Sequence, residues 1–464
     1  MHLKKLFSKS TADFWLNLLI VVLLIALLGQ CAAFLAEFVK KGQAEGEIPF
    51  EMQMLSTSTQ DSRLNIDDAL FQPTLIAVTS EGSTSAVLNS EAVVQEVYAD
   101  INLFLLEALQ QEPVRITSRE WNEAAAQQNY VYLQYPGEFP HQVVFAFAAA
   151  KAESDQQIRQ ADTYVGIREA ILLPDASGKI TYLFVRGRSG AYGFSLGTDE
   201  DLTSDMAAFA RYPQVYPDVF YRGDMRVTDN NSEFVVLDKV TARDIYVSEV
   251  GASALIANRD HLENLFRLLN YNPDKLRYHT ESDGTYVYVE SHGVLRMDAR
   301  TIRYSAAEQG GIALSRIVGQ NTTGDIYTYL RAASHIIWRL SDMDPMYTGG
   351  DAQLFLHSVT SDNGEITLAF SLCSDNIELY KSDENIGLTL TFKEDKIIRM
   401  EHRITVVRRG LDERKLMLQS WYKEQLAPHM PVVMRPIYRM EDSIISASAE
   451  WIAEVLVQEE GGRR

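Results

Sequence analysis

The chain has 464 residues, a formal charge of −20 and 46% hydrophobic residues. This length exceeds one ordinary domain, and the composition is that of a folded protein rather than a disordered one. The acidic charge would repel phosphate backbones, so nucleic acid is not expected as a partner.

An uncharged apolar run extends from Phe14 to Ala36, over 23 residues. A helix of ~20 apolar residues is long enough to cross a bilayer. Lysines at positions 4, 5 and 9 precede the run and favour a cytoplasmic N-terminus. The sequence therefore predicts a cytoplasmic tail over 1–13, a single transmembrane anchor over 14–36 and an extracytoplasmic remainder on the outer side of the cell membrane.

Two other fates of this run stay open. A cleaved signal peptide has a shorter apolar region of roughly 7–15 residues. A lipoprotein would be modified on Cys31, but the small residue expected before the modified cysteine is replaced by Gln30. The length favours the uncleaved anchor, and all three fates place the chain from residue 42 onward outside the cytoplasm.

Small side chains lie along one face of the predicted anchor. Ala26, Gly29, Ala33 and Ala36 are spaced by three or four residues, and Gln30 lies near them. Small residues allow two helix backbones to approach closely in lipid, and a glutamine can add an interhelical hydrogen bond. This face predicts a transmembrane partner contact, although glycine and alanine are also simply common in membrane helices.

In residues 37–62 the apolar residues do not recur at the spacing of a helix or a strand, so this segment is expected to form a linker. A strand is predicted over 74–80, and a helix over 90–111 is predicted because its apolar residues recur at helical spacing (Val94, Val97, Ile101, Leu105 and Leu109). Thr117 and Glu120 have the spacing of a capping box, which predicts a second helix running to about Gln127.

Strand signals dominate the rest of the chain. Strands are predicted over 130–136, 143–147, 167–173 and 179–185, and hairpins over 276–290, 354–372 and 388–407. Helical periodicity returns over 261–269 and 325–340. The fold class predicted is α+β, in which antiparallel sheets carry packed helices, divided into units of about 63–240, 245–345 and 346–464.

One short motif fits a serine hydrolase. Gly193, Ser195 and Gly197 match the G-x-S-x-G nucleophile elbow, in which the serine lies on a strained turn between a strand and a helix. Here the flanking residues alternate as in a strand that continues through Ser195. We therefore expect Ser195 to be structural and the protein not to be an enzyme, with a hydrolase as the weaker alternative.

No cofactor or metal site is predicted. Gly187, Gly190 and Gly193 are spaced like a nucleotide loop, but they join two predicted strands rather than opening a helix. The histidines are scattered without a zinc-ligand spacing, and Cys31 and Cys373 are too far apart in their predicted environments to form a disulfide.

Two stretches resemble the YycH/YycI regulators. In residues 261–304 a helix ending in Leu-Phe is followed by a tyrosine, an Asp-Gly turn and a strand that ends in a hydrophobic residue and Tyr304. Residues 130–140, YVYLQYPGEFP, are similar to a strand of that family with a proline-bounded exit. Proteins of this family are single-pass membrane proteins without a catalytic residue.

The resemblance implies a function. The family's ectodomains associate with each other and adjust the WalK sensor histidine kinase of a two-component system that governs cell-wall homeostasis. The expected partners are therefore a WalK-like kinase, a related single-pass regulator and the membrane. A ligand-binding envelope protein is the alternative from another class, and it would need a pocket lined by convergent polar groups.

Overall fold

The computed structural model describes residues 66–88, 91–152, 165–174, 180–188, 190–195, 219–221, 234–236, 240–249, 252–273, 277–319, 322, 324–381, 387–416, 432–440 and 446–455. All of these residues belong to one compact unit of the chain. Within the described ranges, no helix is both long enough and apolar enough to span a membrane. The predicted anchor and its contact residues lie outside these ranges and stay predictions.

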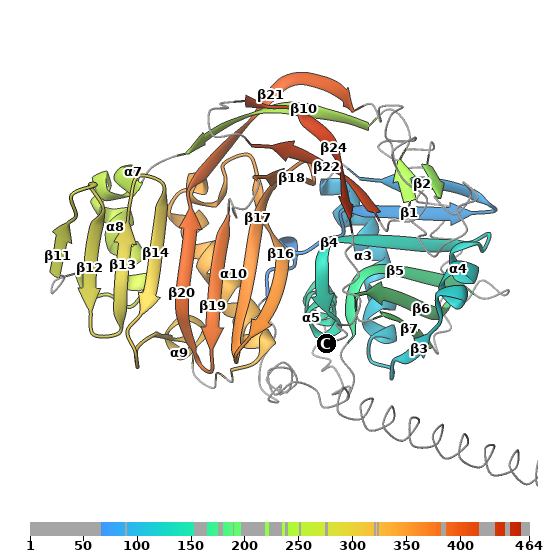
Figure 1. Cartoon of the computed structure of the whole chain (residues 1–464), viewed down its shortest axis with the longest axis horizontal. Coiled ribbons are helices and arrows are strands. Elements are labelled where there is room, and N and C mark those ends of the chain that lie inside the picture. The colour runs from blue at the N-terminus through green and yellow to red at the C-terminus, as the bar shows by residue number, and fades with distance from the viewer. Residues whose placement is uncertain are drawn as a thin grey trace, which may run out of the picture. The chain divides into compact units, whose positions relative to one another are not determined.

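The first sheet has seven strands in the order β2-β1-β4-β5-β6-β7-β3, and its neighbouring strands are all antiparallel (Figure 1). Its strands are β1 (Leu75–Ser80), β2 (Ser83–Val87), β3 (Val114–Ile116), β4 (Tyr130–Pro140), β5 (Gly166–Pro174), β6 (Ile180–Gly187) and β7 (Gly190–Ser195). The helices of this region are α3 (Glu91–Ala108), α4 (Ser118–Ala125) and α5 (His141–Lys151), with a short 3-10 turn η1 (Asp68–Leu70).

Both predicted helices of this region are confirmed. In α3 the predicted apolar stripe is buried along its whole length, so burial of one face stabilises the helix. In α4 the hydroxyl of Thr117 accepts a hydrogen bond from the backbone N–H of Glu120, whose carboxylate accepts one from the backbone N–H of Thr117. This is the capping box that the spacing predicts.

One predicted strand is wrong. Residues 143–147 lie within α5, a helix in which every residue from His141 to Ala149 is buried. A helix buried on all sides has no polar face, so its apolar run cannot be told from a strand by periodicity. Pro140 precedes the first turn, and the alanines that follow favour the helix.

The largest sheet has 12 strands, with the main order β11-β12-β13-β14-β20-β19-β17-β18-β22-β24, while β15 pairs with β20 and β16 pairs with β17. These strands are β11 (Arg277–Thr280), β12 (Tyr286–Glu290), β13 (Gly293–Met297), β14 (Thr301–Ala306), β15 (Ile312–Ala313), β16 (Gln353–Asp362), β17 (Glu365–Ser374), β18 (Ile377–Tyr380), β19 (Leu388–Lys393), β20 (Lys396–Arg403), β22 (Val432–Arg439) and β24 (Ala449–Val455). Its neighbours are antiparallel except β18 and β22, which run parallel. The α+β class with mostly antiparallel sheets is thus confirmed.

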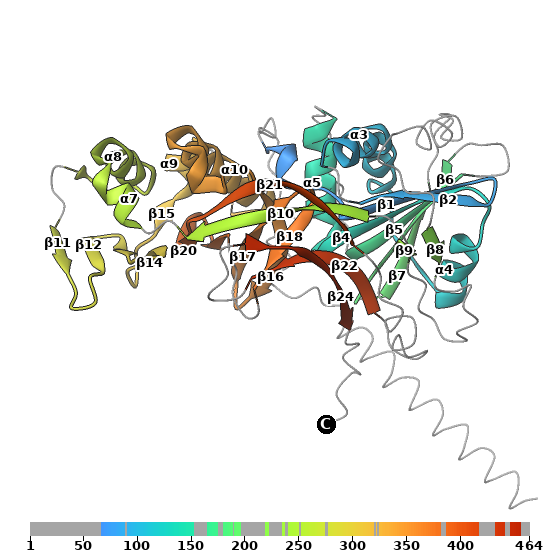
Figure 2. The same cartoon turned by 90° about the horizontal axis from the view of Figure 1, so that it is seen from above.

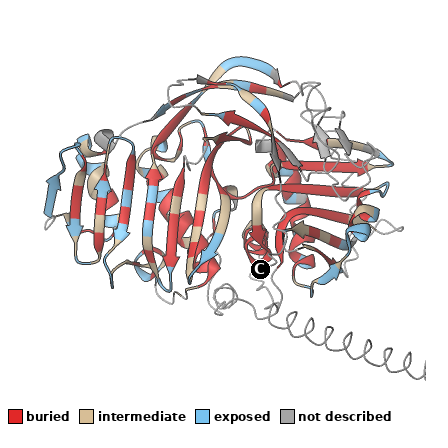
Figure 3. Ribbon diagram, in the orientation of Figure 1, coloured by how far each residue is buried: buried red, intermediate tan, exposed pale blue. Residues whose placement is uncertain are grey.

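The predicted hairpins appear as β11–β12, β16–β17 and β19–β20. The helices α7 (Ala252–Ala257), α8 (Arg259–Leu268), α9 (Leu314–Val318) and α10 (Ile326–Met343) lie on one face of the sheet (Figure 2), with a 3-10 turn η4 (Pro345–Thr348) after α10. Tyr329 of α10 stacks on Phe392 of β19 with ring centroids 4.6 Å apart. Along β13, β14 and β20 buried residues alternate with more exposed ones (Figure 3), as is usual for an antiparallel sheet with one solvated face.

Two smaller sheets complete the described part. One has three strands in the order β21-β10-β23, formed by β10 (Val240–Glu249), β21 (Thr405–Leu416) and β23 (Ser446–Ala447). The other pairs β8 (Val219–Tyr221) with β9 (Phe234–Val236). Because β11 to β14 and β16 to β20 share one sheet, residues 277–306 and 353–403 are continuous through hydrogen bonding. The three predicted units stay a prediction.

Candidate functional site

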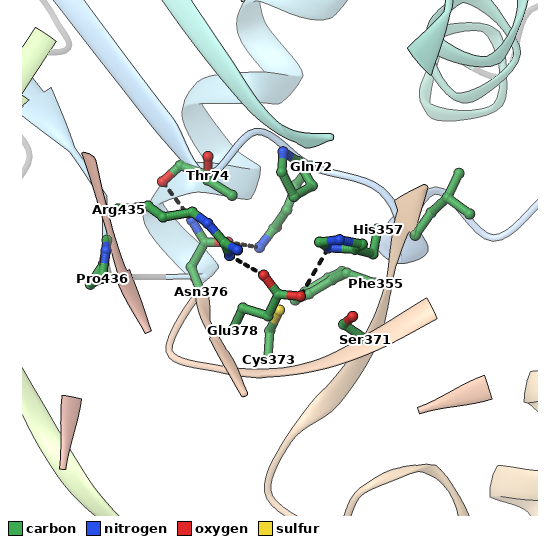
Figure 4. Close-up of a pocket in the computed structure, with 12 residues that line it drawn as sticks. Gln72, Thr74, Phe355, His357, Ser371, Cys373, Asn376, Glu378, Arg435 and Pro436 are labelled. Carbon is green, nitrogen blue, oxygen red and sulfur yellow. Dashed lines mark hydrogen bonds and ion pairs between the residues drawn. The ribbon is translucent and has the colours of Figure 1, made fainter. Parts of the chain in front are cut away.

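A pocket lies where the segment after η1 and the strand β4 meet the strands β16, β17, β18 and β22 (Figure 4). Its empty volume is about 440 Å³, including the part open to solvent. The residues that line it are Gln72, Thr74, Pro136, Phe355, Leu356, His357, Ser371, Cys373, Asn376, Glu378, Arg435 and Pro436. Most of these carry polar side chains, so the pocket is the candidate site of the described region.

Two local features of the strands shape this pocket. The register of β16 against β17 shifts between Leu356 and Ser358, so His357 has no residue directly opposite it. Such a bulge re-aims a side chain and bends its strand. Gly137 of β4 lies so close to β16 that a Cβ atom there would be 2.2 Å from the carbonyl oxygen of His357. Only glycine allows this approach of β4 to the site.

Glu378 is the charged centre of the pocket. Its carboxylate accepts a hydrogen bond from the guanidinium of Arg435, and the Nδ1 atom of His357 lies 2.9 Å from its Oε1 atom. Glu378 and Arg435 are both buried, whereas the side chain of His357 is partly exposed. The acid is therefore held between a buried cation and a ring that faces the pocket (Figure 4).

This arrangement keeps the carboxylate ionised. Burial alone would raise the pKa of Glu378, but the charges of His357 and Arg435 and a hydrogen bond from Ser371 outweigh it and lower the pKa to about 2. A general acid or base works best with a pKa near the operating pH. At neutral pH Glu378 would neither give nor take a proton, so the geometry is that of a structural ion pair.

Polar groups also connect the two sheets at this point. The side-chain amide of Gln72 donates to Oδ1 of Asn376 at 2.7 Å, and the amide of Asn376 donates to the carbonyl of Leu88 at 2.8 Å. Among the described residues the Oε1 atom of Gln72 has no hydrogen-bond partner. The charged groups and most amides of the pocket thus contact one another, which leaves little for a ligand to bind.

Sequence reasoning did not find this cluster. Glu378 and Arg435 are 57 residues apart and meet because β18 and β22 pair in parallel, a long-range pairing without a local signal. In the sequence His357 is only one of nine scattered histidines. Within the described part of the chain, no group of three or more His, Cys, Asp or Glu side chains could hold a metal ion.

The other predicted site residues lie in the β6–β7 hairpin or outside the described ranges. Ser195 is the last residue of β7 and pairs with Tyr182 of β6, which confirms that this serine lies in a strand. Gly187 and Gly190 pair across the hairpin, so the glycine spacing joins two strands and does not open a helix. The residues expected to contact a transmembrane partner, Ala26, Gly29, Gln30, Ala33 and Ala36, lie outside the described residues.

Comparison with known proteins finds no protein-family model and no curated protein that matches the chain. Among solved structures the chain is similar to YycH from Bacillus subtilis, with 12% sequence identity, a TM-score of 0.49, and coverage of 86% of this chain and 96% of that one. It is also similar to an uncharacterized protein from Eubacterium rectale, with 11% identity, a TM-score of 0.30, and coverage of 48% and 80%. TM-scores below 0.5 do not establish a shared fold, and neither likeness assigns a function.

Proposed function

We propose that the chain is a non-catalytic regulator of a sensor histidine kinase in a two-component system. In this proposal residues 14–36 anchor it in the cell membrane and the folded part lies outside the cytoplasm. Its partners are a WalK-like kinase that controls cell-wall homeostasis and a related single-pass regulator. It acts by binding these proteins through its ectodomain and its transmembrane helix, and not by chemistry on a substrate.

The observation that carries the proposal is the order of helix and strands in residues 261–304, the stretch with the strongest resemblance to the YycH/YycI regulators. There α8 is followed by the hairpin β11–β12 and the strands β13 and β14, in the order that the resemblance implies. Phe266 of α8 packs edge-on against Tyr288 of β12 with ring centroids 4.8 Å apart. The local structure supports the resemblance, which in turn supports the regulatory function.

The transmembrane contact is the finer part of the proposal. Ala26, Gly29, Ala33 and Ala36 would form a small-residue seam against a helix of the kinase, with Gln30 beside it as a hydrogen-bond donor or acceptor. Through such a seam, a conformational change of the ectodomain would alter the position of the kinase's transmembrane helices. Replacement of Gly29 and Ala33 by leucine would separate the two backbones.

The test uses the full-length chain and the WalK-like kinase of the same organism, reconstituted together in proteoliposomes. We expect the chain to change the rate of kinase autophosphorylation by about fivefold or more, which is the lower end of usual coupling between sites. The double variant Gly29→Leu, Ala33→Leu should lose both this effect and crosslinking to the kinase within the membrane.

Cys31→Leu is the matched control, because position 31 is about 200° around the helix from Gly29 and also receives a leucine in place of a small residue. It should insert and crosslink like the unchanged chain. An unchanged kinase rate and no crosslinking, from chains shown to insert correctly, would contradict the proposed function. Loss of crosslinking in Cys31→Leu as well would contradict the seam.

A further inference from the structure

β11 is the last strand at one end of the 12-stranded sheet. It pairs with β12, and its other edge is unpaired among the residues that the structure describes. All four of its residues, Arg277 to Thr280, are exposed, and the strand lies at the margin of the sheet in Figures 1 and 3. A free sheet edge is a template for a further strand.

The hydrogen-bond pattern shows which backbone groups face outward. The N–H of Glu281 donates to the carbonyl of Thr285 at 2.9 Å, so these two residues form a hydrogen-bonded pair at the hairpin end. Such pairs alternate along an antiparallel ladder. The register then makes His279 and Val287 the next hydrogen-bonded pair. The N–H and C=O groups of Tyr278 and Thr280 therefore point to the outer edge.

Apolar side chains lie exposed on both faces beside this edge. Tyr278 is 65% exposed and lies 5.8 Å from the ring of Tyr288, on the face that α8 covers further in. Val289 is 44% exposed and pairs with Arg277, so it lies on the opposite face. A strand added to β11 would pack directly against Tyr278, whereas Val289 lies on β12, one strand further in.

The basic side chains of β11 indicate which kind of strand could pair with it. Arg277 and His279 lie on the same face as Val289 and have no ion pair within the described ranges, although the chain as a whole carries a charge of −20. By contrast, Arg296 of β13 lies 3.9 Å from Glu281. A charge on an edge strand can also discourage association, but Tyr278 on the same strand is an exposed aromatic side chain that a partner would cover, and an acidic partner would neutralise the charge of Arg277.

We propose that the outer edge of β11 binds an extended segment of a partner protein in which acidic residues alternate with apolar ones. The acidic side chains would lie on the face of Arg277 and His279, and the apolar ones would cover Tyr278. Backbone pairing would give affinity, and the alternating side chains would give specificity. A second copy of this chain fits less well, because β11 contains two basic residues and no acid.

Binding at the edge of β11 does not require the partner to be a kinase. It can therefore be tested separately from the proposed regulation of a kinase. The probe is the peptide Glu-Tyr-Glu-Val-Glu-Tyr-Glu-amide with fluorescein on its N-terminus, titrated against the full-length protein in detergent. A peptide with lysine in place of every glutamate is the charge control. We expect saturable binding of the first peptide only, and slower hydrogen exchange at the amides of Tyr278 and Thr280 when it is bound.

Thr280→Pro removes an outward N–H without removing a bond of the β11–β12 ladder, because proline is tolerated where the N–H faces away from the sheet. It should weaken peptide binding about tenfold, whereas Thr280→Val, which keeps the N–H, should not. Arg277→Glu should weaken binding by a similar factor. Near-ultraviolet circular dichroism of each variant checks that the fold is kept.

Equal binding of the glutamate and lysine peptides, or unchanged binding by Thr280→Pro, would overturn the proposal. A dimer of the full-length chain that Thr280→Pro dissociates would also overturn it, because the occupant would then be a second copy. Kinase regulation in proteoliposomes could persist in either case, so failure here is distinguishable from failure of the proposed function.

Discussion

The side-chain amide of Gln72 donates a hydrogen bond of 2.7 Å to Oδ1 of Asn376, which lies 304 positions later in the chain. Asn376 itself donates to the carbonyls of Pro73, Thr74 and Leu88, at 3.3, 3.3 and 2.8 Å. A single side chain in the turn between β17 and β18 thus donates hydrogen bonds to backbone carbonyls on both sides of the β1–β2 hairpin, just before β1 and just after β2. This residue fixes the contact between the two sheets beside the pocket.

Asn376→Ala is expected to lower the free energy of unfolding by about 3 kcal/mol, because buried carbonyls and the amide of Gln72 lose their partner. Asn376 also has a φ of 59°, which costs alanine about 1 kcal/mol more than it costs asparagine or glycine. Urea unfolding of the full-length protein in detergent, followed by tryptophan fluorescence, measures the change.

Asn376→Gly is the matched control, since it removes the same hydrogen bonds and keeps the left-handed backbone. It should lose less stability than Asn376→Ala by about 1 kcal/mol. Equal losses would mean that the backbone conformation contributes nothing. Losses below about 0.5 kcal/mol in both variants would mean that the hydrogen bonds of Asn376 do not stabilise the contact.

A second prediction concerns the buried pair of Glu378 and Arg435. Arg435→Met leaves a buried carboxylate without its buried cation, and the loss of one partner in such a pair typically costs about 3–5 kcal/mol. The double variant Arg435→Met, Glu378→Met removes both charges and should recover most of that loss, because paired apolar residues of similar volume replace a buried ion pair well. A double variant that is no more stable than Arg435→Met would contradict this account.

A third prediction follows from the lowered pKa of Glu378, about 2 against an ordinary value of 4.5. Between these pH values the unfolded chain binds a proton that the folded chain does not, so stability falls as the pH falls. The contribution, about 3 kcal/mol, is fully present above pH 4.5 and is lost towards pH 2. Glu378→Gln should lack this part of the pH dependence, and parallel curves for both proteins would show that the carboxylate is not stabilised by its partners.

Local patterns in the sequence predict the elements that have one polar face. The stripe of α3, the capping box of α4 and the hairpins β11–β12 and β16–β17 follow from spacing over a few residues. The same patterns misplace α5, which is buried on every side and so has no period to read. Local sequence also does not determine which sheet a strand joins. β20 ends at Arg403 and β21 begins at Thr405, yet these strands pair in different sheets.

The candidate site was not predictable for the same reason. Each of its three ionisable residues, His357, Glu378 and Arg435, lies on a different strand. His357 is directed by a bulge whose position depends on the pairing of β16 with β17. Only the parallel contact of β18 with β22 brings Arg435 to Glu378. Such pairings depend on the whole fold and leave no short motif.

The last prediction concerns His141, the first residue of α5. Its side chain is buried, and neither ring nitrogen has a hydrogen-bond partner among the described residues. A buried polar group without a partner costs about 1–3 kcal/mol, so His141→Leu should stabilise the protein at pH 7 or leave it unchanged. His402→Leu is the matched control. The ring of His402 is buried too, but its Nε2 atom bonds the carbonyl of Tyr347 at 2.7 Å, so this variant should be destabilised.

The effect of His141→Leu should grow as the pH falls. Burial lowers the pKa of His141 from 6.5 to about 4, so between these values the unfolded chain takes up a proton that the folded chain excludes. The unchanged protein should therefore lose about 3 kcal/mol of stability to this group between pH 6.5 and pH 4, and the leucine variant should not. Urea unfolding of both proteins at pH 7, 5.5 and 4 gives the comparison. A difference that stays constant over this range would show that His141 is protonated in the folded protein or solvated there.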